Sequence, residues 1–157
     1  MRLSISRRGM VATLTLLALG ACLANPTEAA GSDPATDTFA ASLGINLSTF
    51  TKTSDGLYYK DITVGTGATA ASTSTVLVNY TLWTPDGVVR DGPRTNSSFC
   101  LTTQCVIAGF AEGIIGMKVG GHRLIIIPSK LAYGTSGNGN IQPNTSLVFD
   151  VTLNTVN

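Results

Sequence analysis

Apolar and polar residues alternate along several segments after residue 55, which is typical of β-strands that bury one face. In the segment from 75 to 83, Val76, Val78, Tyr80 and Leu82 share one face, so an aromatic hydroxyl lies among aliphatic side chains. A Pro-Asp-Gly turn follows. The strands that we expect are Leu57 to Val64, Thr75 to Trp83, Val88 to Asp91, Phe99 to Leu101, Leu124 to Ile127 and Ser146 to Thr155.

The stretch from Gly109 to Gly134 departs from this alternation. It begins with a helical run, Phe110 to Ile115, that is too short to be stable unless it packs on a neighbour. Leu124 to Ile127 is wholly aliphatic, as in a strand buried on both faces, and Pro128 ends it. Together these elements predict an α+β fold in which five or six antiparallel strands wrap around one short α-helix.

The composition allows one compact domain. The chain has 157 residues, of which 43% are hydrophobic and 12% are charged. Three of the ten basic residues precede residue 10, so the remainder carries seven basic and nine acidic residues, and nucleic acid is not an expected partner. The single histidine, His122, and the cysteines form no metal-binding pattern, and no Ser-His-Asp arrangement is recognisable.

The first 22 residues have the pattern of an export signal. Arg2, Arg7 and Arg8 precede an apolar run of about ten residues, which is short for crossing a bilayer. The run ends in Leu-Gly-Ala-Cys22, which resembles the bacterial lipobox, whose cysteine is lipidated and becomes the N-terminus. Ordinary cleavage near residue 24 or 30, with release of a soluble protein, is the alternative. We expect a lipoprotein signal peptide over residues 1 to 22 and a lipid anchor at Cys22, on the periplasmic side of the cell envelope.

Residues 23 to 54 are rich in Ala, Thr, Ser and Pro, which favours a flexible linker. Phe39, Leu43, Leu47 and Phe50 nevertheless recur at helical spacing. A short amphipathic segment that docks on the domain is therefore the alternative. The domain itself is expected to span residues 55 to 157.

Four motifs occur in order between Gly56 and Leu153, namely NYTLWTPDGVVRD, CVIAGFAEGIIGMKVGGHRLIIIP, LAYG and NTSLVFDVTL. In this order and spacing they resemble the FKBP family of macrolide-binding peptidyl-prolyl cis-trans isomerases. The resemblance implies a curved antiparallel half-barrel with a groove, between sheet and helix, that admits the proline of a substrate. It implies no metal or cofactor, Xaa-Pro-containing unfolded or extended polypeptides as partners, and macrolides as possible inhibitors.

The resemblance also implies roles for individual residues. Tyr80, Asp91 and Tyr133 are the expected catalytic residues: a pocket wall, a carboxylate near the substrate carbonyl, and a loop hydroxyl that donates to the ligand. The backbone N–H of the isoleucine that precedes the helix is expected to bind a substrate carbonyl. The expected substrate-binding residues are Val106, Ile107, Phe110, Phe99, Ile141 and Phe149.

The residues themselves leave other interpretations open. By periodicity alone, Phe149 is more typical of a core residue, and Asp91 of a solvated turn. Arg90 stands where the family has a phenylalanine, and Phe110 where it usually has a tryptophan, which together imply a shallower and less apolar pocket. Alternatively, Arg90 pairs with Asp91 or Asp86 and points outward.

Cys100 and Cys105 lie in the part of the chain that is expected to be exported into an oxidising space. The intervening Leu-Thr-Thr-Gln can form a turn that brings the two cysteines within bridging distance. We expect a disulfide that staples the segment leading to Val106 and Ile107. Two free buried thiols are the alternative.

Two functions from different classes follow. The first is a peptidyl-prolyl cis-trans isomerase that accelerates Xaa-Pro isomerisation in the folding of exported proteins. The second is a non-catalytic binding module or holdase in the cell envelope, which keeps the fold and uses the altered groove to hold extended segments. In either case we expect a monomer that contacts the membrane only through its N-terminal lipid.

Overall fold

The computed structural model describes residues 32–157. The predicted signal peptide, the predicted lipidation site Cys22 and the first part of the predicted linker lie outside the described residues. Within residues 32–157, no helix is long and apolar enough to cross a membrane. In the same range, no three His, Cys, Asp or Glu side chains form a group that could hold a metal ion.

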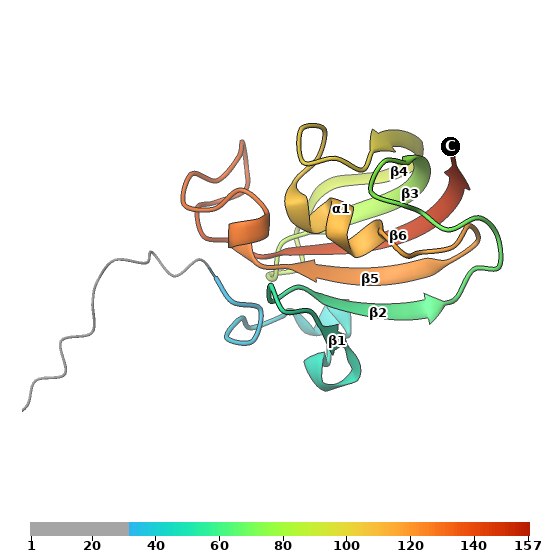
Figure 1. Cartoon of the computed structure of the whole chain (residues 1–157). Coiled ribbons are helices and arrows are strands. Elements are labelled where there is room, and N and C mark those ends of the chain that lie inside the picture. The colour runs from blue at the N-terminus through green and yellow to red at the C-terminus, as the bar shows by residue number, and fades with distance from the viewer. Residues whose placement is uncertain (1–31) are drawn as a thin grey trace, which may run out of the picture.

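Six strands form one antiparallel sheet that curves around α1 (Figure 1). The order across the sheet is β1-β2-β5-β6-β3-β4. This arrangement confirms the predicted α+β fold. The strands are β1 (Thr51–Lys52), β2 (Tyr58–Thr63), β3 (Thr75–Trp83), β4 (Val89–Cys100), β5 (His122–Ile127) and β6 (Leu147–Val156); the helices are α1 (Ala108–Ile114) and the 3-10 turns η1 (Ala41–Leu43), η2 (Leu47–Thr49) and η3 (Ser129–Leu131).

The strand β4 is longer than the pattern predicts. Two short strands were expected, at residues 88–91 and 99–101, but the chain between them also pairs with β3. Gly92, Pro93 and Asn96 are poor strand formers. Their low strand propensity is why the sequence pattern predicts two separate strands instead of one. Pairing is possible because β4 is an edge strand with several irregularities in register, and because Asn79 Oδ1 accepts the Asn96 N–H at 2.9 Å.

The concave face of the sheet and the inner side of α1 enclose the main core. As the alternation predicts, every second residue of β3 and β6 points into it. On the helix, Phe110 and Ile114 are 3% and 0% exposed. The core members from the two strands are Val76, Val78, Leu82, Leu147, Phe149, Val151 and Leu153.

Two glycines on α1 allow the helix backbone to lie directly on β5. A Cβ at Gly109 would come within 2.2 Å of Ile127 Cγ2, and a Cβ at Gly113 within 2.6 Å of Ile125 Cγ2. Residues four apart share one helix face, so both close approaches lie on the side that meets the sheet. A helix of seven residues is not stable alone, and this packing supplies its stability.

Arg123 of β5 joins the end of the helix to the sheet. Its guanidinium makes a two-point contact with Asp61 of β2, with Nε–Oδ1 and Nη2–Oδ2 distances of 2.7 and 3.0 Å. Its Nη1 donates to the Gly113 carbonyl at 2.9 Å, and the guanidinium lies 4.5 Å from the centroid of the Tyr59 ring. Two-point charged contacts fix orientation as well as distance, so Arg123 holds the C-terminal end of α1 in place.

The convex face carries a second core cluster, formed by Tyr58, Ile126 and Val148. Residues 39–50 cover it, on the opposite side of the sheet from α1 (Figure 1). Their backbone forms two 3-10 turns instead of an α-helix, and β1 then pairs with β2. Residues 39–50 therefore dock on the domain, as in the second of the two interpretations of this segment, and do not form a flexible linker. The side chains that pack on the cluster are Phe39, Leu43, Ile45, Leu47, Phe50 and Trp83.

Gly109→Ala is expected to lower the free energy of unfolding by about 1–3 kcal/mol, because overpacking against Ile127 outweighs a gain of about 1 kcal/mol in helix propensity. Urea unfolding followed by the fluorescence of Trp83 measures this change. Glu112→Ala, which adds no atoms to the same helix, is the control and should shift stability by less than about 0.5 kcal/mol. A Gly109→Ala protein as stable as its parent contradicts the close approach of α1 to β5.

Candidate functional site

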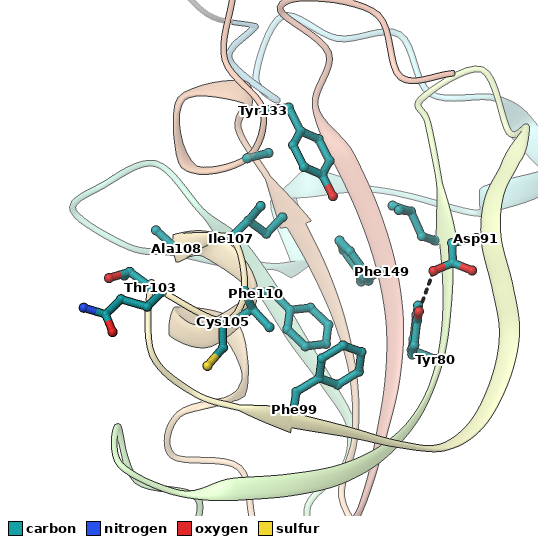
Figure 2. A pocket seen from close by; sticks show the side chains of 14 residues that line it. Tyr80, Asp91, Phe99, Thr103, Cys105, Ile107, Ala108, Phe110, Tyr133 and Phe149 are labelled. Carbon is teal, nitrogen blue, oxygen red and sulfur yellow. Dashed lines mark hydrogen bonds between the residues drawn. The ribbon is translucent and has the colours of Figure 1, made fainter. Parts of the chain in front are cut away.

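A pocket of about 600 Å³ opens between α1 and the concave face of the sheet. Residues from β3, β4, β6, α1, the loop before α1 and the loop after η3 line it (Figure 2). Its volume is in the range typical of small-ligand sites. The lining residues are Tyr80, Leu82, Asp91, Phe99, Thr103, Gln104, Cys105, Val106, Ile107, Ala108, Phe110, Ala132, Tyr133 and Phe149.

The structure brings together around one cavity all but one of the residues expected to be catalytic or substrate-binding. The exception is Ile141, which does not line the pocket. It is 7% exposed and packs in the main core. Asn138 and Ile141 exchange two backbone hydrogen bonds of 2.9 and 2.8 Å, which close a tight turn. This turn sets the backbone at Ile141 so that its side chain fills the core instead of the pocket wall.

Four aromatic rings form the floor of the pocket. Phe110 lies at the centre, with its ring centroid 5.2 Å from that of Phe99, 5.0 Å from that of Phe149 and 6.2 Å from that of Tyr80. The interplanar angles of 68°, 55° and 70° are those of edge-to-face or tilted contacts, which are favourable between aromatic rings. The floor is therefore apolar and tightly packed.

Tyr80, Asp91 and Arg94 form a chain of hydrogen bonds on one wall (Figure 2 shows the Tyr80–Asp91 bond). Tyr80 Oη donates to Asp91 Oδ2 at 2.5 Å, and Arg94 Nε donates to Asp91 Oδ1 at 2.9 Å. Burial, and then the bond to Asp91, raise the pKa of Tyr80 to about 12. The bond from Tyr80, helped by Arg94, lowers the pKa of Asp91. At neutral pH the wall therefore holds a neutral phenol and a carboxylate whose charge is balanced by a guanidinium.

Two hydrogen-bond donors at the pocket have no partner within residues 32–157. The backbone N–H of Ile107, the residue that caps α1, makes no hydrogen bond there. The Tyr133 hydroxyl makes none either, and Figure 2 shows its ring extending into the space above Phe149. Both donors are available to a ligand that carries carbonyl oxygens.

Arg90 does not line the pocket. Its Nε donates to Thr84 Oγ1 at 3.0 Å, and its Nη2 lies 3.6 Å from Asp86 Oδ2. Of the two interpretations drawn from the sequence, the pairing of Arg90 with Asp86 is the one that the structure contains, with the arginine side chain 21% exposed. The cation therefore takes no part in the pocket wall.

Cys100 and Cys105 form a disulfide, with Cα atoms 5.9 Å apart. Of the two alternatives, the structure thus contains the bridge. Cys105 is itself a lining residue, directly before Val106.

Several lining residues were missed from the sequence. Leu82 could have been found, because it shares a strand face with Tyr80. Thr103 and Gln104 lie inside the expected disulfide loop, directly before the expected pocket residues Val106 and Ile107. That position could have indicated that they line the pocket. Ala108 and Ala132 line the pocket next to expected residues, but a small apolar side chain carries no sequence signal of its own.

The sequence model of the family described as FKBP-type peptidyl-prolyl cis-trans isomerase matches residues 67–154. FK506-binding protein 4 of Dictyostelium discoideum is 42% identical to the chain over 100 residues, which are 62% of this chain and 28% of that protein. The FKBP-type peptidyl-prolyl cis-trans isomerase FkpA of Escherichia coli (strain K12) is 36% identical over 121 residues, which are 73% of this chain and 41% of that protein. The chain thus spans less than half the length of these two relatives.

Solved structures of two similar proteins share the fold. The crystal structure of FkpA from Escherichia coli superposes with a TM-score of 0.66 at 35% identity, covering 74% of this chain and 55% of that one. A peptidyl-prolyl cis-trans isomerase from Pseudomonas syringae pv. tomato gives a TM-score of 0.64 at 33% identity, covering 69% of this chain and 80% of that one.

The bonds of Asp91 predict a pH dependence of stability. Because its pKa is lowered in the folded protein, the stabilisation is complete above the unfolded-state pKa and is lost as pH falls through the folded-state pKa. Asp91→Asn is therefore expected to be less stable than the parent by about 1 kcal/mol at pH 7, with the difference shrinking below about pH 4. Urea unfolding from pH 3 to pH 8 measures both curves.

The matched control is Tyr80→Phe. The pKa of Tyr80 is raised, whereas that of Asp91 is lowered. The stabilisation from Tyr80 is therefore complete below about pH 10 and is lost as pH rises through about 12. Tyr80→Phe should therefore leave a nearly constant stability difference between pH 6 and pH 9. Parallel curves for Asp91→Asn and its parent between pH 3 and pH 8 would show that Asp91 is not held as a carboxylate by these bonds.

Proposed function

The chain belongs to the family of FKBP-type peptidyl-prolyl cis-trans isomerases, and we propose that it accelerates the cis-trans isomerisation of Xaa-Pro bonds in unfolded or extended polypeptides. The observation that carries the proposal is a pocket with an aromatic floor and two donors, Ile107 N–H and Tyr133 O–H, that have no partner among residues 32–157. The pocket suits a prolyl ring, and the donors suit the carbonyl groups on either side of it.

The chemistry requires a surface that prefers a twisted amide to a planar one. Resonance gives the peptide C–N bond its double-bond character and a rotation barrier of about 18–20 kcal/mol, so an Xaa-Pro bond isomerises over tens of seconds unaided. At the twisted geometry that resonance is lost, and the carbonyl oxygen carries less charge and needs less water. An apolar pocket therefore binds the twisted form more tightly than the planar form, and this difference is catalysis without a nucleophile.

The residues take the following roles in this proposal. The prolyl ring rests on the floor centred on Phe110, and Ile107 N–H binds a substrate carbonyl and so fixes the peptide relative to α1. The Tyr133 hydroxyl donates to a second substrate oxygen. Asp91 lies near the rotating carbonyl, and its bonds to Tyr80 and Arg94 keep the carboxylate at one position while it is charged.

A non-catalytic holdase remains the second candidate from the sequence. Two departures from the family pattern favoured it, an arginine at position 90 and a phenylalanine at position 110. Arg90 does not line the pocket, so it places no cation in the pocket wall, which weakens the first argument. Phe110 packs against three other aromatic rings, which keeps the floor apolar. We therefore favour the isomerase, with macrolides as inhibitors of the same pocket.

We further propose that the protein acts on exported polypeptides, as a monomer that is held to the membrane by a lipid on Cys22. The Arg-rich start, the apolar run and the lipobox-like end of residues 1 to 22 support export. The bridge between Cys100 and Cys105 supports an oxidising compartment, because such bonds are rare where thiols are kept reduced.

Removing the Ile107 N–H tests the mechanism. Ile107→Pro deletes this donor, and the φ of −60° at Ile107 already suits proline. We expect kcat/KM on an Xaa-Pro peptide in a chymotrypsin-coupled assay to fall about tenfold, the effect of losing one hydrogen bond to substrate. Ile107→Val keeps the N–H and should stay within about threefold of the parent, since it removes a single methylene.

Addition of a macrolide to the parent protein should abolish the accelerated phase. A parent protein that binds the peptide but does not accelerate isomerisation would select the holdase. Equal activity of Ile107→Pro and Ile107→Val would remove the N–H from the mechanism but not the isomerase activity.

The anchor is tested by Cys22→Ser. In cells that produce the full chain, the parent should incorporate a labelled fatty acid and fractionate with membranes. Cys22→Ser should do neither, because its serine oxygen cannot replace the thiol that is lipidated. Cys105→Ser is the matched control and should remain lipidated. A membrane-bound, labelled Cys22→Ser protein would exclude the lipobox interpretation.

A further inference from the structure

The disulfide lies in the wall of the pocket. Cys100 ends β4, and Cys105 is exposed and lines the cavity. Between them, Thr103 and Gln104 also line it, and Ile107 lies two residues after Cys105. The bridge therefore closes the loop that forms this wall and leads directly to the donor expected to hold the substrate.

Within residues 32–157, the two ends of this loop are tied to the domain, at Leu101 and at Val106, but its tip is not. Leu101 is buried, and its N–H donates to the Ser74 carbonyl at 2.9 Å. Beyond it, the N–H groups of Cys105 and Val106 both donate to the Thr102 carbonyl, at 3.0 and 3.2 Å. Across residues 32–157, the backbone hydrogen bonds of residues 102–106 are all made inside the loop. The side chains of residues 102–105 are exposed, so the disulfide is the main restraint on the tip of the loop.

We propose that the Cys100–Cys105 disulfide positions the pocket wall for substrate, and that its reduction weakens substrate binding. The proposal rests on the isomerase function proposed above and makes that function depend on the thiol–disulfide state. An open loop samples more conformations, and binding must then order it, whereas a closed loop is ordered in advance. The effect should fall on binding, because the bridge itself does not contact the rotating bond.

The chemistry is a two-electron exchange with a dithiol reductant. A thiolate of the reductant attacks Sγ of Cys105, which is the more exposed of the two residues, the S–S bond breaks, and Cys100 leaves as a thiolate that takes up a proton. The second thiol of the reductant then displaces Cys105, giving two protein thiols and an oxidised, cyclic reductant. Thr102 Oγ1 lies 3.6 Å from Cys100 Sγ and 3.4 Å from Cys105 Sγ, where its hydroxyl can donate to the leaving thiolate.

The test compares oxidised, reduced and reoxidised protein. The full chain carries Cys22→Ser throughout, so that Cys100 and Cys105 are its only cysteines. Free thiols are counted by alkylation and intact mass with and without dithiothreitol. Isomerisation of an Xaa-Pro peptide is followed by protease-free NMR exchange, so that the reductant acts on this protein alone. The Kd for the same peptide is measured in parallel. Urea unfolding followed by Trp83, which packs on the convex face, shows that each form is folded.

Reduction is expected to lower kcat/KM by about 3–10-fold, mostly through a higher KM, and reoxidation should restore it. The Cys100→Ser/Cys105→Ser protein should match the reduced protein with or without dithiothreitol. Oxidised and reduced proteins with the same KM and Kd would overturn the proposal, as would a protein that is fully alkylated without reductant. If the oxidised protein binds the peptide but does not catalyse, the isomerase function fails. The Kd then decides this inference, with a higher value after reduction supporting it and an unchanged value overturning it.

Discussion

The contact between α1 and β5 is the constraint on which the pocket depends. The helix is seven residues long and too short to persist by itself, so it exists only where the sheet holds it. Gly109 and Gly113 remove the side chains that would keep it away from Ile125 and Ile127. The distance between α1 and β5 also sets how far Phe110, the next residue after Gly109, extends into the aromatic floor. A single packing requirement therefore fixes both the core and the bottom of the site.

The polar groups of the site are arranged so that the pocket stays apolar although it contains a carboxylate. Asp91 receives hydrogen bonds from Tyr80 and Arg94, and its charge is balanced before any ligand arrives. Tyr80 remains a neutral phenol because burial and the bond to Asp91 hold its pKa at about 12. The donors that lack a partner in the described part of the chain are instead the Tyr133 hydroxyl in the pocket wall and the Ile107 N–H at the start of the helix. This division suits the proposed substrate, which offers an apolar ring flanked by carbonyl groups.

Much of this could be predicted from the sequence, and the failures have identifiable physical causes. Periods of two residues located β3 and β6, because one face of each is buried against the helix. The middle of β4 was missed because Gly92, Pro93 and Asn96 have low strand propensity, while edge pairing with β3 outweighs it. Ile141 was placed in the pocket by resemblance, but a turn closed by backbone hydrogen bonds directs it to the core. Propensity and family motifs identify which residues are apolar; only the backbone path determines which cavity they face.

The two faces of the sheet show why one pocket is left open. Both faces are apolar, since β5 presents Ile125 and Ile127 to one side and Ile126 to the other. On the convex side, residues 39–50 lie flat on the cluster around Ile126 and cover it. On the concave side, α1 approaches β5 closely at Gly109 and Gly113, and a pocket remains between the helix and residues of β3, β4 and β6. The loop closed by Cys100 and Cys105 and the loop carrying Tyr133 also line this pocket. The pocket is thus the space that α1 and the concave face leave between them, and the two loops complete its lining.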